Sequence, residues 1–164
     1  MKLRRFVGAT TAAALAPTGA LMSALALWTG SLWGRPTWGT YWVWDARLTS
    51  ELILLFLYLG YMALRAAIDD PRRADKASAI LALVGVVNVP IIYFSVYWWN
   101  TLHQGASISV TRGSTMASTM LIGMLLMVFG LWSYCIAVTL ARVRAIILER
   151  ERRNDWVLTL EPGA

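Results

Sequence analysis

His103 is the only histidine in this chain of 164 residues, which makes it the first candidate for metal chemistry. A single histidine in a loop is usually a solvated polar side chain. His103, however, follows two adjacent tryptophans, Trp98 and Trp99, and imidazole is a common axial ligand of haem iron. The aromatic neighbours therefore favour a ligand role for His103.

A second tryptophan-rich segment, residues 38–47, lies earlier in the chain. If this segment is helical, Trp38, Tyr41, Trp42 and Asp45 share a face, whereas an extended chain aligns Trp38 with Trp42 and Trp44. Either arrangement offers a broad aromatic surface along the membrane. Such a surface suits a flat, apolar, conjugated ligand.

Charged residues flank this aromatic segment. Arg35 and Arg47 can pair with carboxylates on the edge of a ligand, or they are ordinary solvated loop charges. Asp45 can orient Arg47, accept hydrogen bonds from backbone N–H groups, or cap a helix that begins near Leu48. The sequence leaves these alternatives open.

The chain as a whole is too apolar for a soluble enzyme. Hydrophobic residues make up 58% of it and charged residues 15%, against about 45–50% and 25% in soluble domains. A helix needs about 20 residues to cross a hydrocarbon core of about 30 Å. We therefore predict an all-α, polytopic membrane protein, a single membrane domain over residues 1–164. Its four spans are expected near residues 6–29, 48–68, 77–98 and 115–141.

The distribution of basic residues predicts the orientation. Of the 15 lysines and arginines, 12 lie in the N-terminal segment, the second connection or the tail 142–164, and 3 lie in the other two connections. Cytoplasmic segments are rich in Lys and Arg, so both termini are expected in the cytoplasm. The loops 30–47 and 99–114 are then outer loops. An alternative is that residues 1–26 form a cleaved signal peptide, which would leave both loops outside.

This orientation also bears on the charge and on the tryptophans. The net charge of +6 then marks cytoplasmic flanks and contact with membrane lipid, not binding of nucleic acid. An aromatic belt should occur at both interfaces, but the cytoplasmic side has only Trp156. The one-sided excess favours a binding surface. Its tryptophans are Trp28, Trp33, Trp38, Trp42, Trp44, Trp98 and Trp99.

Motifs for catalysis are missing from the sequence. It contains no P-loop glycine cluster, no His-Glu-x-x-His and no nucleophile paired with a histidine. The single cysteine, Cys135, excludes an internal disulfide and a Cys-x-x-Cys site. We predict that the chain is not an enzyme and that another subunit supplies any energy for transport.

The two tryptophan-rich segments resemble those of a known family. Residues 33–51, WGRPTWGTYWVWDARLTSE, resemble the WWD signature of the bacterial haem exporter protein C (CcmC) family of cytochrome c maturation. Residues 98–105, WWNTLHQG, resemble the second outer histidine segment of that family. Two other haem-handling families share the WWD core, but they typically continue with proline after the aspartate, where this chain has Ala46. The resemblance extends from about residue 16 to residue 105.

The resemblance implies a bacterial inner-membrane protein that holds haem at its periplasmic face. It implies transfer of this haem to a membrane-anchored haem chaperone, beside an ABC-type complex of the cytochrome c maturation system. The family has six spans and two outer axial histidines. The chain is thus expected to be short at its N-terminus and to supply one axial ligand, His103. The expected haem site consists of Trp38, Trp42, Trp44, Asp45, Arg47, Trp98, Trp99 and His103.

Three functions are compatible with the sequence. The first is presentation of haem to a chaperone. The second is a permease that moves haem across the bilayer, which requires a polar or wide path that four apolar helices do not suggest. The third is a truncated or structural membrane subunit whose tryptophans only anchor it. Absorbance near the Soret region would separate the third function from the first two.

Overall fold

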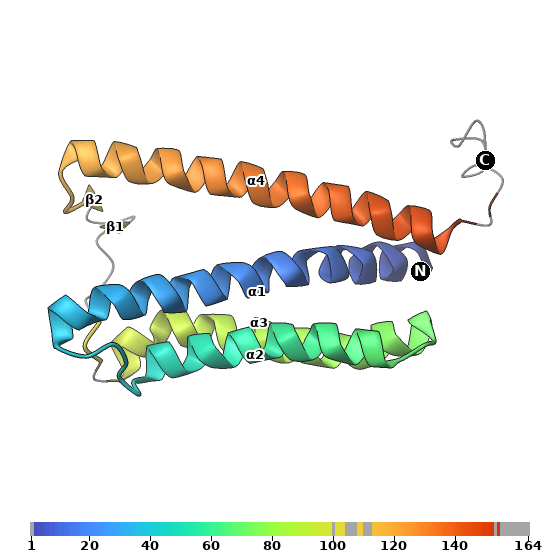
Figure 1. Ribbon diagram of the computed structural model, residues 1–164, viewed down its shortest axis with the longest axis horizontal. Helices are drawn as coiled ribbons and strands as arrows, with labels where there is room; N and C mark the ends of the chain where they lie inside the picture. The colour runs from blue at the N-terminus through green and yellow to red at the C-terminus, as the bar shows by residue number, and fades with distance from the viewer. Residues whose placement is uncertain (1, 100, 104–107, 110–112, 153, 155–164) are drawn as a thin grey trace.

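Four long helices form the part of the protein that the structure describes. The computed structural model describes residues 2–99, 101–103, 108–109, 113–152 and 154 (Figure 1). The rest of the predicted loop 99–114 and of the predicted tail 142–164 lies outside the described residues. The helices are α1 (Lys2–Trp38), α2 (Ala46–Ala67), α3 (Pro71–Trp98) and α4 (Ser118–Arg150).

All four helices are long and apolar enough to cross a membrane, and the predicted all-α membrane fold is confirmed. The candidate span within the first helix is Phe6–Trp38. The predicted loop 99–114 also contains two short strands, β1 (Ile108–Ser109) and β2 (Gly113–Ser114). They pair in an antiparallel ladder in which Ile108 lies opposite Ser114.

Helix α1 is longer than the span expected at residues 6–29, and it includes the first part of the predicted outer loop 30–47. A stretch without charged residues indicates which part of a helix can lie in hydrocarbon, but it does not indicate where the helix ends. The helix ends where Gly39 adopts a φ of +79°, a left-handed conformation that glycine tolerates and that commonly terminates helices. Trp38 is therefore the last residue of α1.

Aspartates begin the next two helices. The Asp45 carboxylate accepts a hydrogen bond from the Leu48 backbone N–H, which places the start of α2 at Ala46. Asp70 accepts from the backbone N–H of Arg72, and Pro71 occupies the first helical position of α3, where its missing N–H costs nothing. Both caps satisfy N–H groups that a helix cannot bond internally.

Helices α1, α2 and α3 form the packed part of the fold. Helix α2 packs most extensively against α3 and next against α1, whereas α4 packs mainly against α1. Figure 1 shows α4 on the side of α1 that faces away from α2 and α3. Small residues dominate the buried positions of α1, as at Ala14, Ala16 and Ala20. Small side chains let membrane helices approach closely.

One buried polar bond joins α2 to α3. The Asn88 side chain donates to the Ser50 backbone carbonyl at 2.8 Å, and Asn88 is 8% exposed. An amide in an apolar span needs such a partner because unpaired polar groups are costly in hydrocarbon. The bond therefore sets the register between the two helices.

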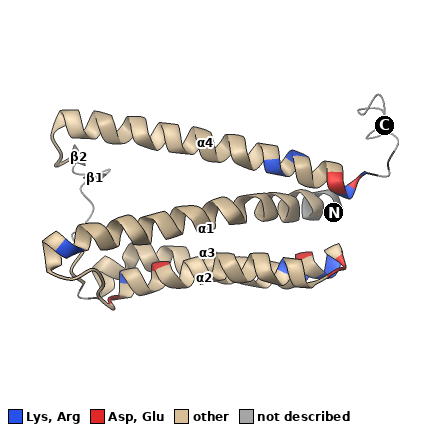
Figure 2. Ribbon diagram, in the orientation of Figure 1, with Lys and Arg blue, Asp and Glu red and all other residues tan. Residues whose placement is uncertain are grey.

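Charged residues gather toward the two ends of the bundle and leave its middle uncharged (Figure 2). At the end that carries the N-terminus and the α2–α3 connection, Asp75 forms ion pairs with Arg65 and Arg150. These pairs join α2, α3 and α4. The Trp-rich connection between α1 and α2 lies at the opposite end (Figure 1).

Candidate functional site

His103 and Asp45 form a hydrogen-bonded pair at the end of the bundle. The His103 Nδ1 atom lies 2.8 Å from Asp45 Oδ2, and the side chains are only 18% and 6% exposed. The backbone N–H of His103 donates to the Thr101 hydroxyl at 3.2 Å. The single histidine of the chain is thus ordered by its neighbours and is not a freely solvated loop residue.

Trp38 packs against the same imidazole. Its ring centroid lies 4.7 Å from that of His103, with the planes at 71°, and 5.4 Å from that of Trp33, with the planes at 84°. These are edge-to-face contacts, which aromatic rings favour. Gly34 leaves room for the ring, because a Cβ atom there would lie 3.2 Å from it.

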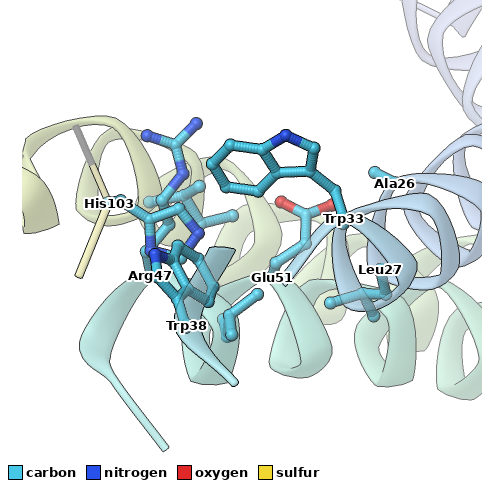
Figure 3. A pocket seen from close by; sticks show the side chains of 10 residues that line it. Ala26, Leu27, Trp33, Trp38, Arg47, Glu51 and His103 are labelled. Atoms are coloured by element: carbon cyan, nitrogen blue, oxygen red, sulfur yellow. The ribbon is translucent and has the colours of Figure 1, made fainter. Parts of the chain in front are cut away.

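A cavity of about 250 Å³ opens beside these rings. Figure 3 shows Trp38, His103 and Arg47 together on one side of it and Trp33 with Glu51 on the other. Ligand pockets usually measure about 300–1,000 Å³, so this cavity can enclose only part of a large flat ligand. Its lining comes from α1, α2, α3 and the His103 segment: Ala26, Leu27, Gly30, Trp33, Trp38, Arg47, Leu48, Glu51, Ile92 and His103.

The structure divides the expected aromatic surface. Trp38 faces His103, whereas Trp42 and Trp44 contact each other, with ring centroids 5.4 Å apart. Neither a continuous helix nor an extended strand joins the three tryptophans, since α1 ends at Trp38 and the residues up to Asp45 are irregular. The Trp42 indole N–H is buried without a hydrogen-bond partner in the described part of the chain.

Trp98 and Trp99 form a separate aromatic group at the end of α3. Trp98 stacks on Phe94 at 5.3 Å and lies 5.9 Å from Trp99. Both tryptophans are more than half exposed, and neither is among the residues that line the cavity. Both precede His103 in the sequence, whereas the ring that contacts the imidazole is that of Trp38.

The two arginines of the loop differ in their surroundings. Arg35 donates to the Gly39 carbonyl at 2.7 Å and lies over the Tyr41 ring, so it stabilises the turn after α1. Arg47 lines the cavity and is exposed, which leaves its guanidinium available for an anionic group of a ligand. The described bonds of the Asp45 carboxylate go to Leu48 and His103, not to Arg47.

The expected haem site included Trp38, Arg47 and His103 of the cavity lining but omitted Glu51. Trp33 was assigned only to the outer aromatic surface. Glu51 follows Arg47 by one helical turn, and residues four apart lie on the same face of a helix. That spacing could have identified Glu51. In the described part of the chain, no three His, Cys, Asp or Glu side chains gather into a metal site.

Comparison with known proteins assigns the chain to a class of membrane proteins that handle haem. Residues 2–158 match the family model described as "Heme exporter protein C" (CcmC). The chain belongs to this family, as its two tryptophan-rich segments suggested. The family's description names an exporter, in agreement with the prediction that the chain is not an enzyme.

Several curated relatives carry the same description. The chain is 51% identical to Heme exporter protein C of Haemophilus influenzae over 147 residues, which cover 90% of the chain and 60% of the relative. It is 55% identical to the protein of Bradyrhizobium diazoefficiens over 143 residues, 87% of the chain and 54% of the relative. For Escherichia coli K12 the identity is 52% over 148 residues, 90% of the chain and 59% of the relative. The chain thus spans less than two thirds of the length of these relatives.

Proposed function

We propose that this chain binds haem at the outer end of the bundle and presents it to a membrane-anchored haem chaperone for the maturation of c-type cytochromes. The observation that carries the proposal is the partly buried Asp45–His103 pair beside a cavity lined by Trp33 and Trp38. A haem requires a nitrogen donor for its iron and apolar surface for its ring. Both occur together here.

Arg47 completes the proposed site. Haem carries two carboxylates on one edge, and a guanidinium pairs with carboxylates through parallel hydrogen bonds. The exposed position of Arg47 on the cavity wall suits contact with this edge. The cavity is not lined by the other four tryptophans of the expected haem site, and the proposed site does not depend on their rings: Trp42, Trp44, Trp98 and Trp99.

The small volume of the cavity favours presentation over storage. A site of about 250 Å³ leaves much of a haem outside the chain, where a second protein can contact it. We propose that this partner is the haem chaperone and that an ABC-type complex of the same system acts beside the chain. In this proposal the loops 30–47 and 99–114 face the periplasm of a bacterial inner membrane, and both termini are cytoplasmic.

A titration with haemin tests the proposed ligand. In the full chain, in detergent or lipid nanodiscs, wild type should develop a Soret band that His103→Ala abolishes or weakens at least tenfold, because loss of even an outer-shell partner typically costs about 10–100-fold in affinity. Trp132→Ala, on the exposed surface of α4, serves as the control and should bind as wild type does. Equal haem binding by His103→Ala and wild type would refute the assignment.

A further inference from the structure

The two oxygens of the Asp45 carboxylate have different partners. Oδ1 accepts the backbone N–H of Leu48 at 2.8 Å, and Oδ2 lies 2.8 Å from His103 Nδ1. The Asp45 side chain is 6% exposed, so both bonds form largely away from solvent. One side chain therefore connects the start of α2 with an imidazole that is 58 positions away in the sequence.

We infer that Asp45 is a positioning residue that fixes the tautomer and the orientation of His103, so that Nε2 is the nitrogen available to iron. This inference rests on the proposed function. An ionised carboxylate can only accept hydrogen bonds, so Nδ1 of a neutral imidazole must carry the proton that it shares with Asp45. The lone pair is then on Nε2.

Such a pair prepares an imidazole for metal binding. Histidines that ligate metals almost always donate their other ring N–H to a carboxylate, carbonyl or water, which fixes the ring and raises its basicity. The contact with Trp38 restrains the same ring from another side. Because α2 begins at the same carboxylate, the position of the ligand is tied to the position of that helix.

Conservative variants can separate the two bonds of Asp45. Asn and Ser cap helices about as well as Asp does, so Asp45→Asn and Asp45→Ser should both preserve the start of α2. In Asp45→Asn, the amide oxygen caps Leu48 and the NH₂ group faces His103. An NH₂ group donates, so Nδ1 must accept and the proton moves to Nε2, where it opposes ligation. Serine is too short to reach the ring and leaves the tautomer unselected.

A matched control exists on the neighbouring helix. Asp70 caps α3 by accepting from the Arg72 backbone N–H and is not bonded to the imidazole. Asp70→Asn therefore reproduces the chemical change at a helix cap without affecting His103. Circular dichroism of all variants checks that the helices persist.

The tautomer can be measured directly because the chain has one histidine. In the full chain labelled with ¹⁵N-histidine, NMR should place the proton on Nδ1 in wild type and Asp70→Asn. It should place the proton on Nε2 in Asp45→Asn and show a mixture in Asp45→Ser. This readout needs no haem.

Haemin titration then links the tautomer to binding. Both Asp45 variants should bind haem about 10–100-fold more weakly than wild type, while Asp70→Asn should match wild type. The carboxylate also favours ferric over ferrous haem, so the midpoint potential should rise in these variants. The midpoint potential rises by about 59 mV if the loss of affinity is tenfold greater for ferric than for ferrous haem.

The possible results distinguish the two proposals. If His103 is required for haem binding but the Asp45 variants keep the wild-type tautomer and affinity, the inference about Asp45 is wrong and the proposed function stands. If the tautomer changes as expected but wild type binds no haem, Asp45 controls the imidazole and the proposed function is wrong. A tautomer change without a loss of haem affinity would overturn the role of Asp45 in ligation.

Discussion

Substitution of Trp38 tests whether packing around the imidazole makes the site. The Trp38 ring contacts Trp33 and His103, and each aromatic pair contributes about 0.5–1.5 kcal/mol beyond the area that it buries. Trp38→Ala removes both pairs and therefore about 1–3 kcal/mol of the free energy that stabilises the site around His103. Because 1.4 kcal/mol corresponds to a tenfold change in affinity, haem should bind roughly 5- to 150-fold more weakly.

Trp44 provides the matched control for this experiment. It belongs to the same Trp-rich segment, but it is 75% exposed and its ring contacts Trp42. Trp44→Ala should change the free energy of haem binding by no more than about 0.5 kcal/mol, as for most surface substitutions. Haemin titration followed in the Soret region, with circular dichroism to check folding, measures both variants. If Trp44→Ala weakens binding as much as Trp38→Ala does, the rings act as one apolar surface and the argument from packing fails.

Two further predictions concern topology and helix packing. With the native cysteine replaced by serine, Thr37→Cys should react with an impermeant maleimide once the outer membrane is permeabilised, whereas Asp69→Cys should react only after the inner membrane is broken. The reverse pattern would invert the proposed orientation. Gly19→Ala should destabilise the fold by about 1–3 kcal/mol, because a Cβ atom there lies 2.6 Å from a tyrosine ring carbon on α2. In thermal unfolding, Gly8→Ala should leave stability nearly unchanged, since its Cβ meets no atom within 4 Å. Equal effects at the two glycines would contradict this account of the α1–α2 contact.

Local chemistry allowed much of the fold to be predicted. Stretches with few charged residues predicted the four long apolar helices of the described part of the chain, because hydrocarbon excludes charged residues over a fixed thickness. One of the alternatives considered for Asp45, a cap for the helix that begins near Leu48, is confirmed by the bond to the Leu48 N–H. Capping depends on residues only three apart, so a sequence can reveal it.

The composition of the candidate site was harder to predict. The Asp45–His103 bond joins residues 58 positions apart, and no local pattern encodes that contact. The aromatic segment was expected to be uniformly helical or extended. Instead, Gly39 adopts a left-handed conformation and ends α1 within this segment, so Trp38 is separated from Trp42 and Trp44. Whether haem contacts these residues is a prediction that the titrations above will test.

The unequal packing of the helices sets how freely each one can vary in sequence. In the described part of the chain, the apolar stretch of α4 contains no buried residues, whereas 33% of the residues in the apolar stretch of α1 are buried. Where α4 contacts no other described helix, packing within this chain does not limit the volume of its side chains, so the structure constrains those positions through hydropathy. Positions such as Ala14 and Ala20 of α1 are limited by volume, because a larger side chain would push neighbouring helices apart. Random mutagenesis should therefore recover many apolar replacements in α4 and few in the buried face of α1.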